Sequence, residues 1–494
     1  EVGSSSTGDP EDGCVITDLP DIDGFDNDLD GVDGTMCGLV FVNPTAVAGG
    51  NGLSPTAPLS SLVEAIDLAA SFEPARDVLV VRGSLAESIE LRGGVDIYGG
   101  YLPGFVGRDP QLPTVLVGDG SAHTIRGHAV DAPVTVQNFV VIGRDGDAPG
   151  VSGYAVTILA SVGALISFDH CTIVAGDGMD AADGADGVHG GNGGDGAHGD
   201  EDGAGGTSTC ASDGGDGARA MMCPMSVALA GGGVGEGVAG ISAEADCAGT
   251  VCTDVPNPGG HGGDGNDGVH GSGAKCSDGL GKLDDSGAWV MPSPTASIAG
   301  LSGGGGGGGG AASLDIDGPG CATTIFVNGG IGGGGGGAGC GGGAGESGGT
   351  GGSSIAIAVV DADIELRATT IVRGLAGDGG DGGNGGNAGH GGVGGIGRMG
   401  QGPGAAAAGD GGRGGDGGVG GGGAGGCSGS AIGIVHRGLG QLLMQQLTFE
   451  GGDVGMPGTG GLGGTGGGST AIQVAERMGE PGCPGVIIET LKQP

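Results

Sequence analysis

Short runs of alternating apolar and polar residues recur along the chain, most densely between residues 38 and 175. A period of two is the pattern of half-buried β-strands. It predicts strands at 39–42, 78–81, 89–91, 95–98, 114–117, 134–141, 155–159 and 164–168. One stretch has helical spacing instead, because Leu62, Ala65, Ile66 and Ala69 fall at i, i+3, i+4 and i+7. We expect a helix over 59–70, capped by Ser60 or Ser61.

After residue 150 a longer repeat begins. An alternating strand is followed 12 to 17 residues later by a hydroxyl–apolar step, and the chain then enters a glycine-rich tract. The strands lie at 155–158, 312–316, 354–359 and 431–435, and the steps at 172–173, 324–325, 370–371 and 448–449; a last strand at 471–474 is expected to pair with 486–488. A unit of about 20 residues cannot bury its own apolar face, so the units should stack as coils of a parallel β-solenoid.

The glycine-rich tracts hold a strict period of three. Every third residue is glycine from 330 to 351 and from 374 to 395, and shorter versions run over 184–199, 259–271 and 452–467. Three residues per turn is the repeat of polyproline II, at ~3.1 Å per residue, so a tract of 22 residues reaches about 68 Å. We expect ordered rods that leave the solenoid at one corner, return, and lie side by side both parallel and antiparallel.

The composition of the chain excludes several classes of function. The chain has 494 residues, 135 of them glycine, with 2% aromatic residues and a net charge of −42. Such a chain can build only a thin aliphatic core. Lysine is rare and no basic cluster exists, which argues against nucleic acid as a partner. Residues 148–168 lack charge, but their glycines, proline and alternation favour strands, so no membrane span is expected.

Twelve cysteines, an even number, indicate disulfides and an oxidising compartment. The candidates are Cys14 and Cys37, which bracket an acidic segment, and a middle group of Cys210, Cys223, Cys247, Cys252, Cys276, Cys321 and Cys340. A bridge from Cys14 to Cys37 would stabilise a segment with almost no core by about 3 kcal/mol. The chain starts at Glu1 rather than Met, which we interpret as a secretory signal already removed, and we expect an extracellular or cell-surface location.

The segment between these two cysteines is the candidate metal site. Its carboxylates are Asp21, Asp23, Asp26, Asp28, Asp30 and Asp33. Asp26, Asp28, Asp30 and Gly31 match the first half of a calcium loop, whereas Cys37 stands where the bidentate glutamate of an EF-hand would be. We predict calcium binding by an acidic coil of another kind. A solvated acidic linker is the alternative.

Residues 39–101 resemble the opening of secreted right-handed parallel β-helix proteins distantly like pectate lyases, of a type common in myxobacteria. The match rests on a strand, a Pro58-Leu59 step, the amphipathic helix, the sequence VVRGSLAESIEL, and then VDIYGGY. It implies a β-helix whose first coils are capped by the helix. The glycine tracts resemble, in pattern only, the polyglycine II bundles of the snow flea antifreeze protein and of some phage tail-fibre adhesins.

These features predict an all-β chain with an inserted rod bundle, divided into a head (1–37), a capped β-helix (38–175), a cysteine-containing insertion (176–311) and further coils alternating with rods (312–494). No catalytic motif stands out, and Asp361, Asp363, Arg367 and Arg373 fit charged residues at solenoid turns. We expect a structural protein, the self-assembling subunit of a surface filament or sheath, with itself as partner. The alternatives are a polysaccharide-binding or polysaccharide-cleaving β-helix protein and, third, an ice-binding protein.

Overall fold

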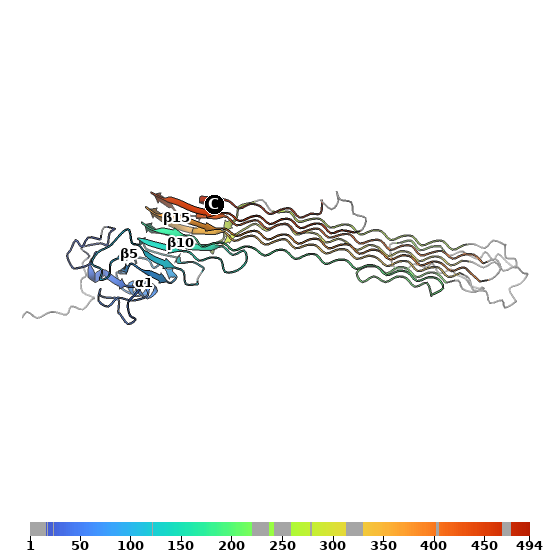
Figure 1. Cartoon of the computed structure of the whole chain (residues 1–494), viewed down its shortest axis with the longest axis horizontal. Helices are drawn as coiled ribbons and strands as arrows, with labels where there is room; N and C mark the ends of the chain where they lie inside the picture. Colours follow the sequence, from blue (N-terminus) through green and yellow to red (C-terminus); the bar gives the residue numbers. More distant parts are fainter. Residues whose placement is uncertain are drawn as a thin grey trace, which may run out of the picture.

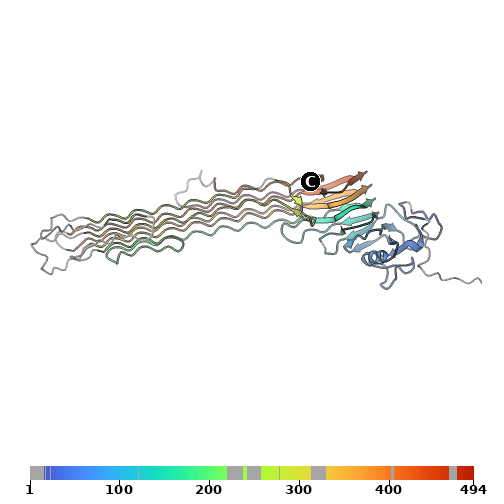
Figure 2. The ribbon, with the colours of Figure 1, turned by 180° about the vertical axis from the view of Figure 1, so that it is seen from behind.

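Parallel β-sheets form one end of the molecule, and a long, straight bundle of extended segments projects from them (Figure 1). The view from behind shows the same two parts (Figure 2). The computed structural model describes residues 16, 18–22, 24–120, 122–219, 237–241, 258–276, 279–312, 330–401, 405–466 and 476–494.

The strands build two large sheets, and every pairing within them is parallel, as expected for stacked solenoid coils. Along its main path the eleven-stranded sheet contains β1 (Leu39–Val42), β2 (Asp77–Val81), β5 (Ile97–Tyr101), β8 (Val134–Gln137), β10 (Gly153–Asp169), β14 (Ser354–Arg367), β16 (Ala431–Arg437) and β19 (Ile487–Gln493). Beside this path lie β4 (Ile89–Glu90), β7 (Ile125–His128) and β17 (Leu442–Gln445). The six-stranded sheet contains β3 (Ser84–Ala86), β6 (Thr114–Val117), β9 (Phe139–Ile142), β11 (Thr172–Val174), β15 (Thr370–Leu375) and β18 (Thr448–Asp453).

The expected strands within the described residues are present, but the strand expected at 95–98 is shifted to Ile97–Tyr101, and β3 and β7 are among those not expected. Two further differences concern where strands divide. The run predicted at 134–141 is divided into β8 and β9 by Asn138, whose φ of 60° turns the chain at a solenoid corner. Asparagine tolerates this left-handed conformation better than most residues. Conversely, 155–159 and 164–168 belong to one strand, β10, which is bent at Ala160 (φ 50°) and shifts register after Ser161. The coil expected at 312–325 lies outside the described residues except for Ala312, and so does the strand expected at 471–474.

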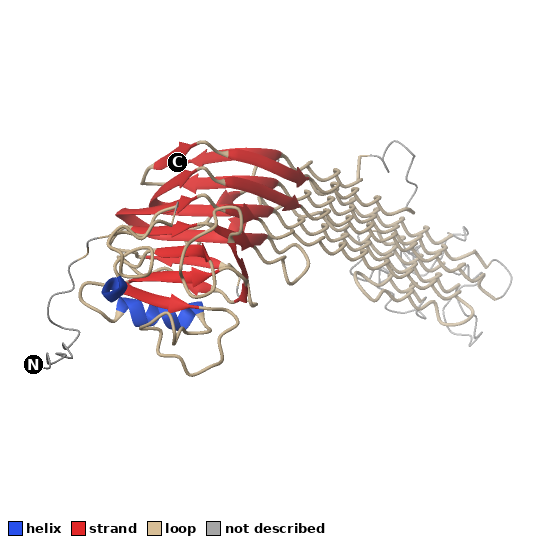
Figure 3. Cartoon of the chain, turned by 60° about the vertical axis from the view of Figure 1, so that its left-hand side comes forward, coloured by secondary structure: helices blue, strands red, loops and turns tan. Residues whose placement is uncertain are grey.

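The core between the sheets is aliphatic, as the composition predicts, with Phe139 and Phe168 as its large aromatic side chains. Helix α1 (Leu62–Ala70) buries Leu62, Ala65, Ile66 and Ala69 against β1 and β2 at one end of the solenoid (Figure 3). The short helix η1 (Met36–Gly38) directly precedes β1. Ser61 caps α1 by accepting the N–H of Glu64 at 3.2 Å. This confirms the predicted cap.

The glycine tracts connect solenoid coils and share one corner. The chain leaves the solenoid after β11, β15 and β18 and re-enters it at β14, β16 and β19 (Figure 1). The first excursion also returns to the base, where the hairpin of β12 (Lys282–Leu283) and β13 (Trp289–Val290) covers the outer face of the large sheet. Trp289 donates its N–H to the Tyr154 hydroxyl at 2.7 Å.

The excursions are rods joined by backbone hydrogen bonds of period three. Ala181, Gly184, Gly187 and later residues donate to Asp378, Asp381 and Asn384 at a constant offset, which makes these rods parallel. Gly334 and Gly337 donate to Ala197 and Gly194 in the opposite order, so the rod that starts at 330 is antiparallel to the first. Because polyproline II has no internal hydrogen bonds, this mutual bonding is what orders the bundle. The prediction of parallel and antiparallel rods side by side is confirmed.

Glycine is required by the closeness of the rods. A Cβ added at Gly334 would lie 2.0 Å from the carbonyl oxygen of Ala204, and at Gly335 it would lie 2.1 Å from that of Gly306. At Gly336 it would lie 1.9 Å from the oxygen of Gly392. Three successive residues therefore face three different rods, and no side chain fits at any of them.

Candidate functional site

The acidic head brings together three carboxylates. Oxygen atoms of Asp18, Asp26 and Asp28 all lie within 4.8 Å of one another. Their spacing is set by hydrogen bonds: Asp26 accepts the N–H groups of Asp30 and Gly31 at 3.1 and 2.9 Å. Hard carboxylate oxygens at this spacing match the donor set that calcium prefers, and their mutual repulsion would be relieved by a divalent cation. The chemistry of the cluster therefore fits the predicted ion.

Asp18 is the buried member of this cluster and was not among the predicted ligands. Burial raises the pKa of its carboxyl, but N–H groups donated by Asn27 and Gly34 outweigh burial and hold the pKa below its ordinary value. Asp18 is thus ionised at neutral pH and able to bind a cation. It lies before the alternating Asp run, so the spacing that identified the other carboxylates could not reveal it.

The other predicted ligands separate from the cluster. Asp30 accepts the N–H of Met36 at 2.7 Å, and Asp21 accepts the N–H of Gly24 at 3.0 Å. Asp33 is buried against the solenoid, where its carboxylate accepts the Tyr101 hydroxyl at 2.6 Å. Burial raises the pKa of Asp33 to about 6, although the Tyr101 hydrogen bond opposes this shift. Asp23 and Cys14 lie outside the described residues, and Cys37 is disulfide-bonded.

A buried arginine joins the head to the solenoid. Arg108 donates to the backbone oxygens of Asp21 and Gly99 at 2.8 and 2.7 Å and also to the Gln137 side chain. Gln137 donates in turn to Asp169 at 2.7 Å. This network fixes the head on the first coils, and sequence reasoning missed it because its members are scattered along the chain.

Polar side chains on the rods have a structural task. In the first rod, Asp180, Asp183 and Asp186 each accept the N–H of the corresponding residue in the next parallel rod, at 2.6–2.8 Å. Histidine takes the same place at His189 and His198, through Nδ1 at 2.9 and 2.8 Å. All five side chains are exposed, and they satisfy backbone groups along the bundle surface.

Two disulfides clamp the rods. Cys210 bonds Cys340, both from the predicted middle group. Cys427 bonds Cys483, a pair that the sequence analysis did not include. Cys276 lies beside this second bridge, with its sulfur 3.3 Å from that of Cys427. Cys223, Cys247, Cys252 and Cys321 lie outside the described residues.

The carboxylates of Asp361 and Asp363 on β14, which the sequence analysis assigned to solenoid turns, serve a solenoid corner. Asp361 accepts the N–H of Leu439 at 2.7 Å, and Asp363 accepts those of Gly163 and Gln441 at 2.6 and 2.7 Å. Two open hollows border the head, one at Asp18 and Asn27 and the other at Asp26 and Arg108.

Comparison with known proteins found no family, no curated protein and no solved structure that matches this chain. The described residues contain two helices, α1 and η1. Neither is long and apolar enough to cross a membrane.

Proposed function

We propose that the protein is an extracellular structural protein, whose rod bundle is a stiff projection and whose solenoid joins copies of the chain. The observation that carries this proposal is the bundle itself. Gly336, for example, donates its N–H to Gly412 at 2.9 Å, and its carbonyl oxygen accepts from Gly306 at 2.8 Å. A bundle cross-linked in this way resists bending. The clamps Cys210–Cys340 and Cys427–Cys483 suit an oxidising compartment.

The C-terminal end of the solenoid supports association. Strands β18 and β19 are the last of their sheets. The edge strand β19 exposes Ile487 to 51%, and Leu443 and Met444 of the neighbouring β17 are also exposed. Unpaired strand edges with apolar side chains invite another strand. The opposite end is covered by α1, so a second copy would dock through the same C-terminal edge, as a two-fold symmetric pair. Growth of such pairs into a filament or sheath would use the sides of the rods.

The type of β-helix is part of the same proposal. The helix-capped first coils support a right-handed, pectate-lyase-like β-helix of the myxobacterial type, without its catalysis. Polysaccharide binding is less favoured, because the side chains of Tyr101, Tyr154 and Trp289 that could stack on sugars are buried.

Light scattering coupled to size-exclusion chromatography, together with electron microscopy, tests the association. We expect elongated particles that pair through their solenoid ends. Ile487→Lys places a charge on the edge strand and should weaken pairing at least about tenfold, or ~1.4 kcal/mol. Val188→Lys is the matched control, since Val188 is 80% exposed on a rod, and it should leave pairing unchanged. Wild-type monomers at every protein and calcium concentration would refute the association.

A further inference from the structure

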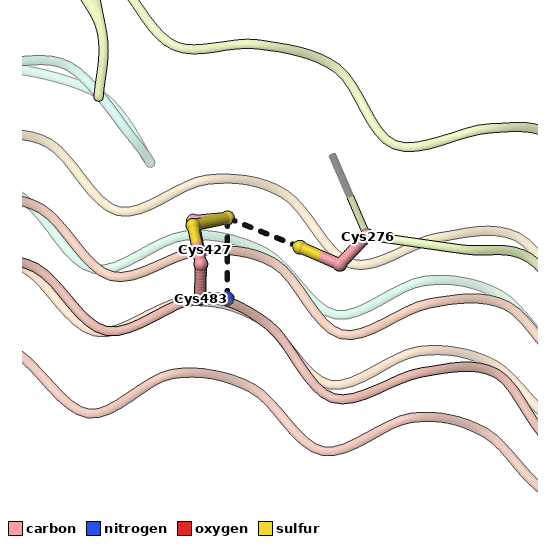
Figure 4. Close-up of side chains that lie close together, drawn as sticks. All are labelled: Cys276, Cys427 and Cys483. Atoms are coloured by element: carbon pink, nitrogen blue, oxygen red, sulfur yellow. Dashed lines mark hydrogen bonds between the residues drawn. A yellow bond between two sulfur atoms is a disulfide. The ribbon is translucent and has the colours of Figure 1, made fainter. Parts of the chain in front are cut away.

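Three cysteines meet where three rods meet. Cys276, Cys427 and Cys483 have their sulfur atoms within 4.8 Å of one another (Figure 4). Cys427 and Cys483 share a disulfide, and Cys276 carries a thiol whose sulfur lies 3.3 Å from that of Cys427. A disulfide needs sulfurs about 2.05 Å apart, so the sulfur of Cys276 lies little more than 1 Å beyond bonding distance of Cys427.

The rods hold this arrangement in place. Ala274 donates its N–H to Gly422 at 2.9 Å, and Glu480 donates to Ala274 at 3.0 Å. Next to the bridge itself, Ser428 donates to the carbonyl oxygen of Cys483 at 3.0 Å. Each of the three rods is therefore bonded to both others close to its cysteine, which keeps the backbones of the three cysteines together.

We propose that these residues form a thiol–disulfide exchange site in which Cys276 and Cys483 alternate as partners of Cys427. The thiolate of Cys276 attacks Sγ of Cys427, the Cys427–Cys483 bond breaks, and a Cys276–Cys427 bond forms. Cys483 leaves as a thiolate and takes up the proton that Cys276 released. One disulfide and one thiol are present before and after, so the step needs no oxidant or reductant.

Burial defines the roles of the three sulfurs. Cys427, the shared partner, is buried, whereas Cys276 and Cys483 are partly exposed. An outside thiol therefore reaches the central sulfur less readily than the neighbouring Cys276 does. The thiol that remains, on Cys276 or on Cys483, is open to modification. Before exchange, the disulfide joins the 405–430 rod to the 476–485 segment. After exchange, it joins the 405–430 rod to the 258–276 rod.

The decisive experiment uses Cys483→Ser in the full chain, purified without reductant, alkylated with N-ethylmaleimide and mapped by non-reducing mass spectrometry. We expect a Cys276–Cys427 linkage and loss of nearly all label from Cys276. Cys340→Ser is the matched control, because the described residues place no third cysteine beside Cys210–Cys340, and here Cys210 should be labelled. Label on both Cys276 and Cys427 in folded Cys483→Ser overturns the proposal.

Wild-type protein gives a second readout if that variant does not fold. After incubation at pH 8.5 and alkylation, label should appear on Cys483 as well as on Cys276, and prior alkylation of Cys276 should abolish the label on Cys483. Label confined to Cys276, with Cys427–Cys483 as the sole linkage of the trio, overturns the proposal in this arm.

Discussion

At many positions in this protein, the backbone atoms of a neighbouring segment decide which residue type fits, because an added Cβ would lie within about 2–3 Å of them. In the rods, the carbonyl oxygen of a neighbour occupies the space of a Cβ, and this explains a composition that would otherwise favour disorder. In the solenoid, single residues such as Asn138 take a left-handed φ at a corner. Residue choice is therefore strict at rod interiors and corners and relaxed on the rod surface.

Adding one methyl group inside the bundle should be costly. Gly336→Ala places a Cβ against three neighbouring backbone atoms, the nearest at 1.9 Å, and we expect a loss of about 1–3 kcal/mol, seen as a lower midpoint of thermal unfolding. Gly191→Ala is the control, because its nearest contact would be 3.6 Å. Equal effects of the two substitutions would show that the rods are looser than the structure indicates.

A partly buried pair of carboxylates, Asp77 and Asp96, makes the solenoid sensitive to pH. Burial, and then the nearby Asp96, raise the pKa of Asp77 to about 7. Because the folded state holds this proton more tightly than the unfolded chain, the free energy of unfolding should fall as the pH rises from about 4 to about 7. Asp77→Asn keeps an acceptor for the Asp96 N–H. It should reduce this dependence, of which Asp33 with its raised pKa keeps a part, and stabilise the protein at pH 8.

Urea unfolding across this pH range measures the effect. Asp67→Asn is the control, since the Asp67 side chain is 61% exposed on α1, and it should leave the pH dependence as it is. A wild-type protein whose stability rises between pH 4 and 7 would contradict the raised pKa of Asp77.

Each element of the fold depends on a neighbour from another part of the chain. The rods satisfy one another's backbone groups, and the hairpin β12–β13 covers the outer face of β10, β14 and β16. Helix α1 is capped twice, by its own Ser61 and by Glu87, whose carboxylate accepts the N–H groups of Leu62 and Val63 at 2.8 and 3.1 Å. This contact gives a physical reason for the glutamate in the VVRGSLAESIEL sequence.

Removing the second cap should loosen the covered end of the solenoid. We expect Glu87→Ala to cost about 1–2 kcal/mol, because two N–H groups at the positive end of the helix lose a charged acceptor. Glu90→Ala, an exposed position on β4, should change the free energy of unfolding by less than about 0.5 kcal/mol. Circular dichroism during denaturation measures both, and equal losses would argue against the cap.

The whole molecule combines a stiff shape with a net charge of −42. Self-repulsion of that size opposes association, so the proposed pairing depends on neutralisation by cations. The Asp18, Asp26 and Asp28 cluster provides a site for one of them, at the end of the solenoid that carries the head.

Calcium should therefore stabilise the head and favour assembly. Isothermal titration should show calcium binding that Asp28→Asn weakens at least about tenfold, whereas Asp147→Asn, an exposed carboxylate elsewhere, should have no effect. EDTA should lower the thermal stability of the wild type. If EDTA changes neither stability nor assembly, the calcium proposal is wrong.

Periodicity along the chain was enough to predict the strands, the capped helix and the rods, because a period of two, 3.6 or three is a property of the local backbone. The meeting of distant residues was not predictable in this way. Asp18 joins Asp26 and Asp28 through a fold of the head, and Cys276 meets Cys427 across 151 positions. Such contacts depend on the register in which rods and coils stack, and that register is set by hydrogen bonds and glycine contacts between segments, which leave no period in the sequence.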